Sequence, residues 1–591
     1  MPSTFVEKIF KAPAGSIVFH RPDLILTHDN TGSIRQTFEK MGGRELRDPD
    51  RLVVVLDHNA PPTSAALANT YQAIRDFVTQ QGIEKFHDVG SGICHQIMAR
   101  YAKPGMVIVG SDSHTCTSGA FNAMAAGIDR TEAAGLWLRG ETWFRVPESL
   151  KISLGGRLKQ GVYAKDLSLW IIGILGSAGA NYMSIEFHGD GVQSLDISDR
   201  MTLANLASEM GAKNAVFPAD QVLKEYLGEE SAGVWADEGA VYGREIAIDL
   251  GEVYPLVAAP HHVDNVMGLA EVAGMDIHQG LIGTCTNGRI EDLREAAAIL
   301  KGQKVKPGVQ LLIIPASREI YLQAIEEGLV KIFLEAGANV LSSSCGPCLG
   351  TGQGIPADHM RIISSANRNF LGRMGNKNAE IYLASPAAVA LSAIHGKISD
   401  PRKPNNGAEK FPFRKQQSGS ISIEEGERRR QNGVWAYGDV DNLNTDQMFA
   451  GNLTYEVQSS DPEAIIPHLF KGFDSCFAEE LQQGDIILGG DNFGCGSSRE
   501  HPAVGLAHKG VKAVIVKSVN RIFYRSAVNQ GLALIVLPKA VTAYRKGDAV
   551  GIDFVAGTVS VGTQEFHFEP LPEKLLAILE MKGLVNWIRN Q

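Results

Sequence analysis

The chain has 591 residues, of which 44% are hydrophobic and 21% charged, and its formal net charge is −10 at pH 7. This composition is typical of a folded globular protein and excludes global disorder. At roughly 150 residues per domain, the length predicts about four domains. The negative charge disfavours binding to nucleic acid or to an anionic membrane surface.

The sequence shows neither a membrane span nor a secretion signal. The longest strongly apolar stretch, 167–176, is far shorter than the about 20 residues that cross a bilayer. Residues 1–10 lack a basic start followed by a long apolar block. Seven cysteines are too few for a disulfide scaffold in so long a chain. We therefore expect a protein of the reducing cytoplasm.

Up to about residue 399, short β-branched segments alternate with longer amphipathic segments. Strands are predicted at 51–56, 106–110, 309–314 and 361–364, and helices at 65–80 and 289–300. Apolar strands that alternate with helices predict α/β units around mostly parallel sheets. In such sheets, functional side chains collect in loops beyond the carboxyl ends of strands.

The composition changes at Asp400. Residues 401–432 are rich in Pro, Asn, Gly, Ser and charged residues, which predicts an exposed linker. A new α/β pattern begins at Gly433, with strands predicted at 485–488 and 511–516. The predicted organisation is a catalytic region over 1–400, a linker over 401–432 and a C-terminal domain over 433–591.

Three cysteines lie in two glycine- and serine- or threonine-rich segments, GTCTNG (283–288) and SSSCGPC (342–348). They are Cys285, Cys345 and Cys348. The residues alone leave three interpretations open: packing cysteines, a dithiol redox site with the CGPC motif of thioredoxins, and iron–sulfur ligands. The polar surroundings disfavour packing. Three ligands for a four-iron cube would leave one iron open to substrate, as in catalytic zinc sites.

Histidines and aspartates recur after predicted strands. Asp57 and His58 follow the strand at 51–56, Asp112 and His114 follow the strand at 106–110, and His95 follows a Gly-Ser-Gly turn. A carboxylate beside an imidazole favours its protonated form. One such histidine is more often structural than catalytic, but three in one α/β region favour catalysis.

Two later loops carry arginines, SANRNFLGR (365–373) and NFGCGSSREH (492–501). The second loop lacks the Gly-Lys-Ser/Thr ending of phosphate-binding loops, which disfavours nucleotide binding. Helix capping is the structural alternative for its serines. The guanidinium groups favour a carboxylate ligand.

Together, eight segments resemble the aconitase family of aconitases, homoaconitases and 3-isopropylmalate dehydratases. In chain order they are SGICHQIM, GSDSHTCTSGA, IEFHGDGV, GTCTNGRIEDL, SSSCGPCLG, SANRNFLGR, NTDQ and GCGSSREHPA. The resemblance extends to about Gly531 and implies three α/β/α domains around a cluster site plus a C-terminal swivelling α/β domain. Both parts lie on one chain here, whereas many 3-isopropylmalate dehydratases carry them as two subunits.

The resemblance implies a [4Fe–4S] cluster as the cofactor. Its three protein ligands would be Cys285, Cys345 and Cys348. The fourth iron, without a protein ligand, would act as a Lewis acid toward the carboxylate and hydroxyl of the substrate. The implied activity is the reversible dehydration of a hydroxy di- or tricarboxylic acid.

The same resemblance assigns the other site residues. Ser497 would remove a proton from carbon, and His58, paired with Asp57, would protonate the departing hydroxyl. The residues that would position the hydroxyl are Asp112, His114, His95 and Glu186. The carboxylates would be held by Arg368, Arg373 and Arg499, with Ser498, Asn367, His28, Thr445 and Asp446 as further substrate-binding residues.

The stretch after NTD (444–446) predicts the substituent that the substrate carries. Aconitases and homoaconitases place an arginine there, whereas this chain has no Arg or Lys from 447 to 470. A carboxylate buried against Met448, Phe449 and Leu453 would be costly. We therefore expect an apolar substituent, as in 3-isopropylmalate or 2,3-dimethylmalate, and rank citrate and homocitrate lower.

Two other classes of function remain alternatives. A cluster-free RNA-binding regulator, as among the iron-regulatory relatives of aconitase, is disfavoured by the net charge of −10. A thioredoxin-like oxidoreductase would not need Cys285. The four cysteines without an assigned role are predicted to pack in the interior: Cys94, Cys116, Cys476 and Cys495. The sequence leaves the oligomeric state open.

Overall fold

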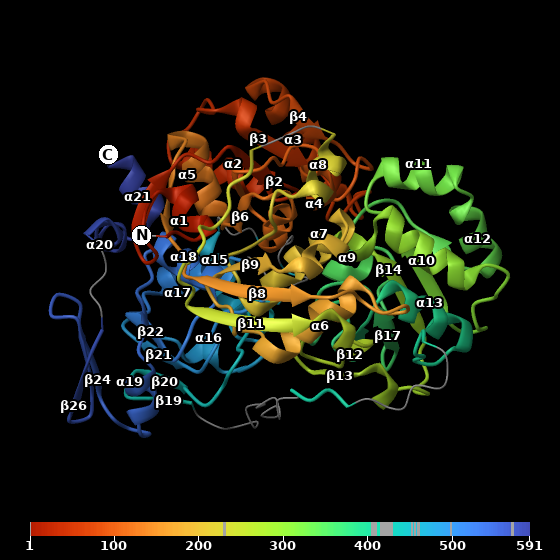
Figure 1. Ribbon diagram of the computed structural model, residues 1–591. Coiled ribbons are helices and arrows are strands. Elements are labelled where there is room, and N and C mark those ends of the chain that lie inside the picture. The colour runs from red at the N-terminus through yellow and green to blue at the C-terminus, as the bar shows by residue number, and fades with distance from the viewer. Residues whose placement is uncertain are drawn as a thin grey trace.

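The computed structural model describes residues 2–228, 232–402, 410–413, 429–450, 453, 457, 461–496, 499–568 and 573–590. Within these residues, four sheets are wholly or mostly parallel, and helices pack against them (Figure 1). The fold class is therefore α/β, as the alternation of apolar strands and helices predicts.

The first sheet has the order β4-β3-β2-β5-β6 and is parallel throughout. Its strands are β2 (Leu24–Thr27), β3 (Leu52–Val55), β4 (Lys85–His87), β5 (Val107–Gly110) and β6 (Met124–Gly127). The strands predicted at 51–56 and 106–110 are confirmed as β3 and β5, and the helix predicted at 65–80 is α3 (Ala65–Gln81). All four residues of β3 are buried, as expected for a central parallel strand.

Two further sheets complete the first 400 residues. The second, ordered β10-β9-β8-β11, consists of β8 (Ser149–Gly155), β9 (Ser184–His188), β10 (Asn214–Val216) and β11 (Arg244–Asp249). The third has the order β13-β12-β18-β17-β14-β15-β16. Its parallel strands are β14 (Gln279–Gly283), β15 (Gln310–Ile314), β16 (Asn339–Val340), β17 (Arg361–Ser364) and β18 (Glu380–Leu383), and its antiparallel edge is β12 (Leu256–Ala258) and β13 (Val266–Gly268). The predictions at 309–314 and 361–364 are thus confirmed.

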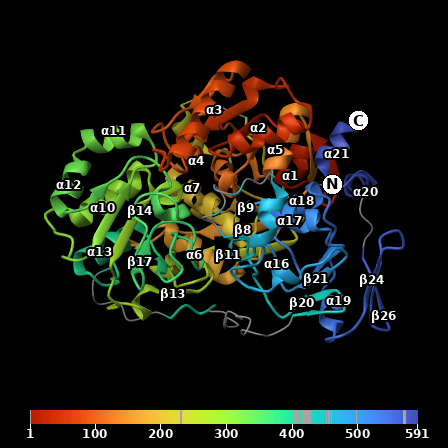
Figure 2. The ribbon, with the colours of Figure 1, turned by 180° about the vertical axis from the view of Figure 1, so that it is seen from behind.

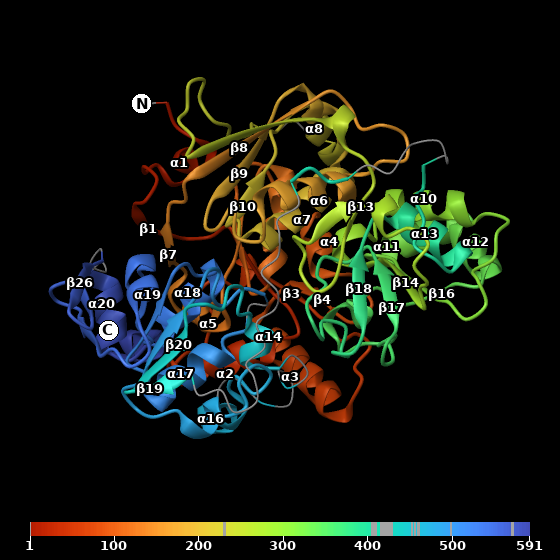
Figure 3. The same cartoon turned by 90° about the horizontal axis from the view of Figure 1, so that it is seen from below.

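The C-terminal part has its own sheet, ordered β19-β20-β21-β22-β23. Its strands are β19 (Arg430–Gln431), β20 (Val434–Tyr437), β21 (Ile486–Gly489), β22 (Ala513–Val516) and β23 (Leu534–Val536). A small antiparallel sheet follows, formed by β24 (Val550–Asp553), β25 (Thr558–Val561) and β26 (Gln564–His567). Viewed from below, the C-terminal elements, the β8–β10 region and the β14/β17/β18 region occupy three separate sectors (Figure 3).

The C-terminal helices pack on the first part of the chain. Leu575 and Ile578 of α20 (Glu573–Glu580) and Trp587 of α21 (Leu584–Arg589) share a hydrophobic core with Phe5 and Phe38. Helix α18 (Arg521–Asn529) contacts α5 (Arg130–Arg139) and lies beside it in Figures 1 and 2. The two parts of the chain therefore share buried apolar surface.

Most of the predicted linker at 401–432 lies outside the described residues. Within it, Phe411 is 4% exposed and packs edge-on against Trp170, at 5.4 Å between ring centroids. Its described neighbours, residues 410, 412 and 413, are exposed, so Phe411 alone is anchored on α6 (Ala164–Leu175) by burial of its aromatic ring.

Candidate active site

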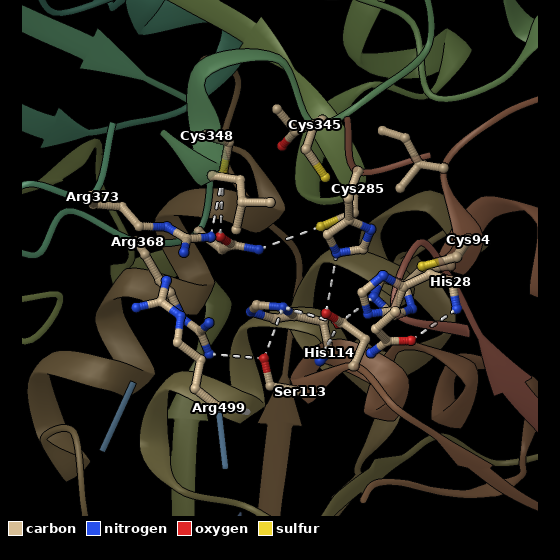
Figure 4. A pocket seen from close by; sticks show the side chains of 18 of the residues that line it. His28, Cys94, Ser113, His114, Cys285, Cys345, Cys348, Arg368, Arg373 and Arg499 are labelled. Atoms are coloured by element: carbon tan, nitrogen blue, oxygen red, sulfur yellow. Dashed lines mark hydrogen bonds and ion pairs between the residues drawn. The ribbon is translucent and has the colours of Figure 1, made fainter. Parts of the chain in front are cut away.

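Two turns bring the three cysteines to one cavity. Cys285 lies in α9 (Thr284–Asn287), directly after β14, and the other two lie in and next to a 3-10 turn at Gly346–Leu349. Cys285, Cys345 and Cys348 all line one cavity. Figure 4 shows them at the top of the view, with Ser113 and Arg499 below.

Glycine is required immediately before the Cys285 turn. Gly283 has a φ of +131°, and a Cβ at this position would lie 2.1 Å from the carbonyl oxygen of Ile314. Only glycine fits this close approach of two backbones without displacement. The turn that carries Cys285 therefore depends on the small residue that the sequence places there.

The cysteine sulfurs lie in a polar, buried environment. Asn205 and Asn367 donate to Cys285 Sγ at 3.5 and 3.4 Å, and Arg373 donates to Cys348 Sγ at 3.9 Å. All three thiols are free of disulfides. Burial, and then the neighbouring Cys348, raise the pKa of Cys285 to about 11. Metal binding at these thiols would therefore release protons.

The sulfurs are spread more widely than a single ion requires. Among the described residues, the groups of three or more histidine, cysteine or carboxylate donors within 4.8 Å of one another include none of these cysteines. Thiolates around one tetrahedral zinc lie about 3.8 Å apart, as follows from Zn–S bonds of about 2.3 Å. The three sulfurs therefore do not form a compact tetrahedral site for a single ion.

A network of imidazoles surrounds Asp112 in the same cavity. His95 donates to Asp112 at 2.7 Å, and His58 Nε2 lies 3.4 Å from the other carboxylate oxygen. His58 Nδ1 donates to Asp57 at 2.7 Å. Burial would lower the pKa of His58, but Asp57, Cys345 and Asp112 raise it well above its ordinary value. The acidic groups around His58 therefore favour the protonated form of its imidazole.

The loop that carries His58 is fixed by a buried carboxylate, Asp29. The backbone N–H groups of Asp57 and His58 donate to Asp29 Oδ1 at 2.9 and 3.2 Å, and that of Asn59 donates to Oδ2 at 2.8 Å. Tyr71 also donates to this carboxylate, at 2.5 Å. Asp29 thus holds the loop in one conformation.

His28 follows β2 and stacks on His58. Their ring centroids are 3.9 Å apart and the rings are 17° from parallel. Burial and the charge of His58 lower the pKa of His28 to about 3. The cavity therefore contains a neutral imidazole beside a cationic one.

Glu209 is a site residue that the sequence reasoning missed. His114 Nε2 donates to Glu209 at 2.7 Å, and Arg368 Nε donates to both carboxylate oxygens at 2.9 and 3.0 Å. Burial opposes ionisation, but Arg368 and His114 hold the pKa of Glu209 at about 2. Glu209 follows a helix rather than a strand, in a 3-10 turn at Ala207–Met210, so no strand-end signal marked it.

The structure does not bring Glu186 to this cavity. Its carboxylate accepts from Phe5 N–H at 3.0 Å and from Tyr242 O–H at 3.1 Å, and Glu186 is not among the residues that line the cavity. The reason is its position inside β9, where its side chain faces the N-terminal helix. The carboxylate that contacts His114 is instead that of Glu209, which lines the adjoining cavity.

The arginines reach the cavity from two parts of the chain. Asn367, Arg368 and Arg373 follow β17, and Arg499 enters from the C-terminal part. Arg499 pairs with Asp446 of α14 (Thr445–Met448). Burial favours the neutral acid, but Arg499 and Arg373 hold the pKa of Asp446 below its ordinary range.

Three further residues were expected in the site, and the structure describes only Thr445 of them. Thr445 begins α14, is buried and donates its N–H to Cys495, but it is not part of the cavity lining. Ser497 and Ser498 lie outside the described residues. Their neighbours in the sequence, Gly496 and Arg499, line two adjoining cavities.

The apolar residues expected to contact the substrate lie elsewhere. Met448 and Phe449 are fully buried in the core of the C-terminal part, and Leu453 packs against that core. None of them lines the cavity, whereas Arg130 does. A substituent in this cavity would therefore not contact these three side chains.

The remaining cysteines differ in burial. Cys116 and Cys495 are buried, as expected of packing residues, and Cys94 is buried and lines the cavity. Cys476 is exposed, so the packing role predicted for it is wrong. None of the helices in the described ranges is both long enough and apolar enough to cross a membrane.

Comparison with known proteins places the chain in a family. Residues 5–396 match the aconitase family (aconitate hydratase), and residues 415–540 match the aconitase C-terminal domain. The chain therefore belongs to the aconitase family, with both parts on one polypeptide. It is a hydro-lyase.

Individual relatives agree with this assignment. The chain is 47% identical over 417 residues to 3-isopropylmalate dehydratase large subunit 2 of Archaeoglobus fulgidus, which covers 68% of this chain and 100% of the relative. It is 42% identical over 418 residues to the methanogen homoaconitase large subunit of Methanocaldococcus jannaschii, covering 67% of this chain and 99% of the relative. A crystal structure of a 3-isopropylmalate dehydratase from the latter organism gives a TM-score of 0.24 at 34% identity, covering 25% of this chain and 88% of that chain.

Proposed function

We propose that Cys285, Cys345 and Cys348 hold a [4Fe–4S] cluster and that the cavity below them dehydrates a hydroxycarboxylic acid. The observation that carries this proposal is the convergence of three free thiols, several histidines and four arginines on one cavity. Two amide N–H groups directed at Cys285 Sγ support a thiolate there. When bound, the cluster supplies a Lewis acid for the substrate hydroxyl and carboxylate.

The protein side chains supply the proton transfers. His58, held by Asp57 and cationic because of its neighbours, is proposed to give its Nε2 proton to the departing hydroxyl. Ser497 is proposed as the base that removes the proton from carbon. Support for this role comes from Arg499, two residues further on, which lines the cavity and brings positive charge to it.

The other polar groups are proposed to orient the substrate. Arg368 and Arg373 bind carboxylates, because guanidinium groups match carboxylate geometry with two parallel hydrogen bonds. Glu209 holds Arg368 and His114 in place. Exclusion of water strengthens each of these interactions, since the effective dielectric constant of a buried site is low.

We propose a 3-isopropylmalate-like dicarboxylate as the first substrate candidate. Relatives named 3-isopropylmalate dehydratase support it, as do the apolar side chains Ile93 and Leu349 in the cavity lining. The second candidate is homocitrate. Arg130, a further guanidinium in the lining, favours an additional carboxylate, and a relative is named homoaconitase.

Anaerobic reconstitution with iron and sulfide, followed by a panel of hydroxy di- and tricarboxylates, tests the proposal. The unsaturated product is followed by its ultraviolet absorbance. We expect dehydration of 3-isopropylmalate by reconstituted protein and none without iron. A preference for homocitrate would make the second candidate the substrate. If the reconstituted protein acts on none of the acids in the panel, the proposed function is contradicted.

A further inference from the structure

Lys165 is a fully buried lysine to which the proposed hydration chemistry gives no role. It lies in the first turn of α6 and is 0% exposed. Its ammonium donates to the main-chain carbonyls of Ser365 at 3.0 Å and Ala366 at 2.5 Å. A buried ammonium is costly unless negative charge compensates it.

The loop that this ammonium holds contacts two cysteines. Asn367 donates to Cys285 Sγ at 3.4 Å, and its side-chain Oδ1 accepts from Cys348 Sγ at 3.8 Å. Ser365 Oγ accepts from the N–H of Gly283, two residues before Cys285, at 3.0 Å. One lysine therefore anchors a loop that is hydrogen-bonded to both cysteine turns.

The groups that favour a charged Lys165 are Cys348, Cys285, Glu209 and Asp292. Glu209, Asp292 and Cys348 each also have an arginine neighbour. Burial lowers the pKa of Lys165 to about 7, and the two cysteines act to raise it. The sulfurs would add negative charge near this ammonium once they bind a metal centre as thiolates, because the loop that Lys165 holds contacts Cys285.

We propose that Lys165 is the buried counter-cation of the iron–sulfur cluster, which fixes the Ser365–Asn367 loop and raises the reduction potential of the cluster. This inference rests on the proposed ligation by cysteines. A [4Fe–4S]²⁺ core with three thiolates carries one net negative charge, and uptake of one electron adds a second. A positive charge nearby favours the reduced form by Coulomb attraction.

The test is the midpoint potential of the reconstituted protein. Wild type, K165Q, K165M and K165R are titrated anaerobically with dithionite, which supplies one electron to each cluster, and the reduced cluster is followed by electron paramagnetic resonance. Glutamine keeps a hydrogen-bond donor without the charge, whereas arginine keeps the charge. K213Q is the matched control, because Lys213 is also fully buried but faces Arg525 and Glu132.

We expect K165Q and K165M to shift the ratio of reduced to oxidised cluster at least tenfold toward the oxidised form, which is 59 mV for one electron. K165R and K213Q should stay within about threefold of wild type. A wild-type potential in K165Q would overturn the proposal, and so would an equal shift in K213Q. K165Q and K165M could fail to fold or to take up the cluster, in which case K165R decides. Wild-type iron content and reduction potential in K165R then support the proposal, and the loss of either overturns it.

The wild-type sample separates this inference from the proposed function. If wild type takes up no iron and sulfide, the proposed ligation itself fails. If wild type is loaded and active while K165Q has an unchanged potential, only the role of Lys165 fails.

Discussion

Arg525 of α18 and Glu132 of α5 form a buried ion pair between the C-terminal part and the first part of the chain. Both side chains are 1% exposed, and Arg525 Nε donates to Glu132 at 2.8 Å. The guanidinium also lies over the Trp143 ring, at 3.7 Å from its centroid. Any movement of the C-terminal part away from α5 must separate this pair.

Arg525→Met should strongly destabilise the protein. It leaves the Glu132 carboxylate buried without its partner, which costs about 3–5 kcal/mol. Urea unfolding measures the loss. Arg294→Met is the control, because Arg294 and Glu327 form a solvent-exposed pair whose loss should change stability little. Equal losses in the two variants would contradict the account, whereas Glu132→Gln should restore part of the stability of Arg525→Met.

Much of the fold could be predicted from the sequence because buried parallel strands carry a local signal. The segment 51–56 is a continuous β-branched and leucine run, and β3 occupies Leu52–Val55. The predicted helix at 289–300 is α10 (Ile290–Leu300). Contacts between parts of the chain carry no such local signal. The Arg525–Glu132 pair joins residues 393 positions apart and depends on the complete tertiary structure.

The same contrast between local signals and tertiary contacts decides which site residues could be predicted from the sequence. His58 and Cys285 follow strands whose carboxyl ends can be located in the sequence, and both reach the cavity. Glu209 and Lys165 lie in helical segments, and only folding brings them to the partners that define them. Glu186 lies in IEFHGDGV, one of the segments that resemble the aconitase family, but its side chain faces the N-terminal helix.

Glu209→Gln should reduce kcat/KM by about ten- to a hundredfold. The change removes charge-assisted hydrogen bonds to His114 and Arg368, each worth about 1.5–3 kcal/mol. Steady-state kinetics with the preferred substrate measures it, and the exposed Glu327→Gln variant is the control. A larger loss for Glu186→Gln than for Glu209→Gln would restore Glu186 as the site carboxylate.

Asp129 should contribute a loss of stability as the pH rises toward neutrality. Burial, and then the charges of Glu500 and Glu132, raise its pKa from 3.8 to about 7. A carboxyl group whose pKa is raised in the folded state stabilises that state below its unfolded pKa, and the contribution disappears as the pH rises to the folded pKa. Asp129→Asn should therefore flatten the fall in unfolding free energy between pH 4 and pH 7. An unchanged slope in urea unfolding would disprove this assignment.

Gly283→Ala should displace the Cys285 turn. The new Cβ would lie 2.1 Å from the Ile314 carbonyl, at a φ of +131° that alanine rarely adopts. We expect a folded protein with less than half of the wild-type iron after reconstitution. Gly274→Ala is the control, because its Cβ would meet nothing within 4 Å at a similarly positive φ of +89°. Full iron content in Gly283→Ala would show that this turn tolerates the shift.

The most direct test of the central claim is the iron and sulfide content of Cys285→Ser, measured beside its dehydratase activity. Cys116→Ser is the control, since Cys116 is buried but does not line the cavity. After anaerobic reconstitution, we predict that Cys285→Ser lacks both the [4Fe–4S] cluster and the dehydratase activity. Cys116→Ser should keep both. A Cys285→Ser protein with wild-type iron, sulfide and activity would contradict the assignment of these three thiols as the ligands.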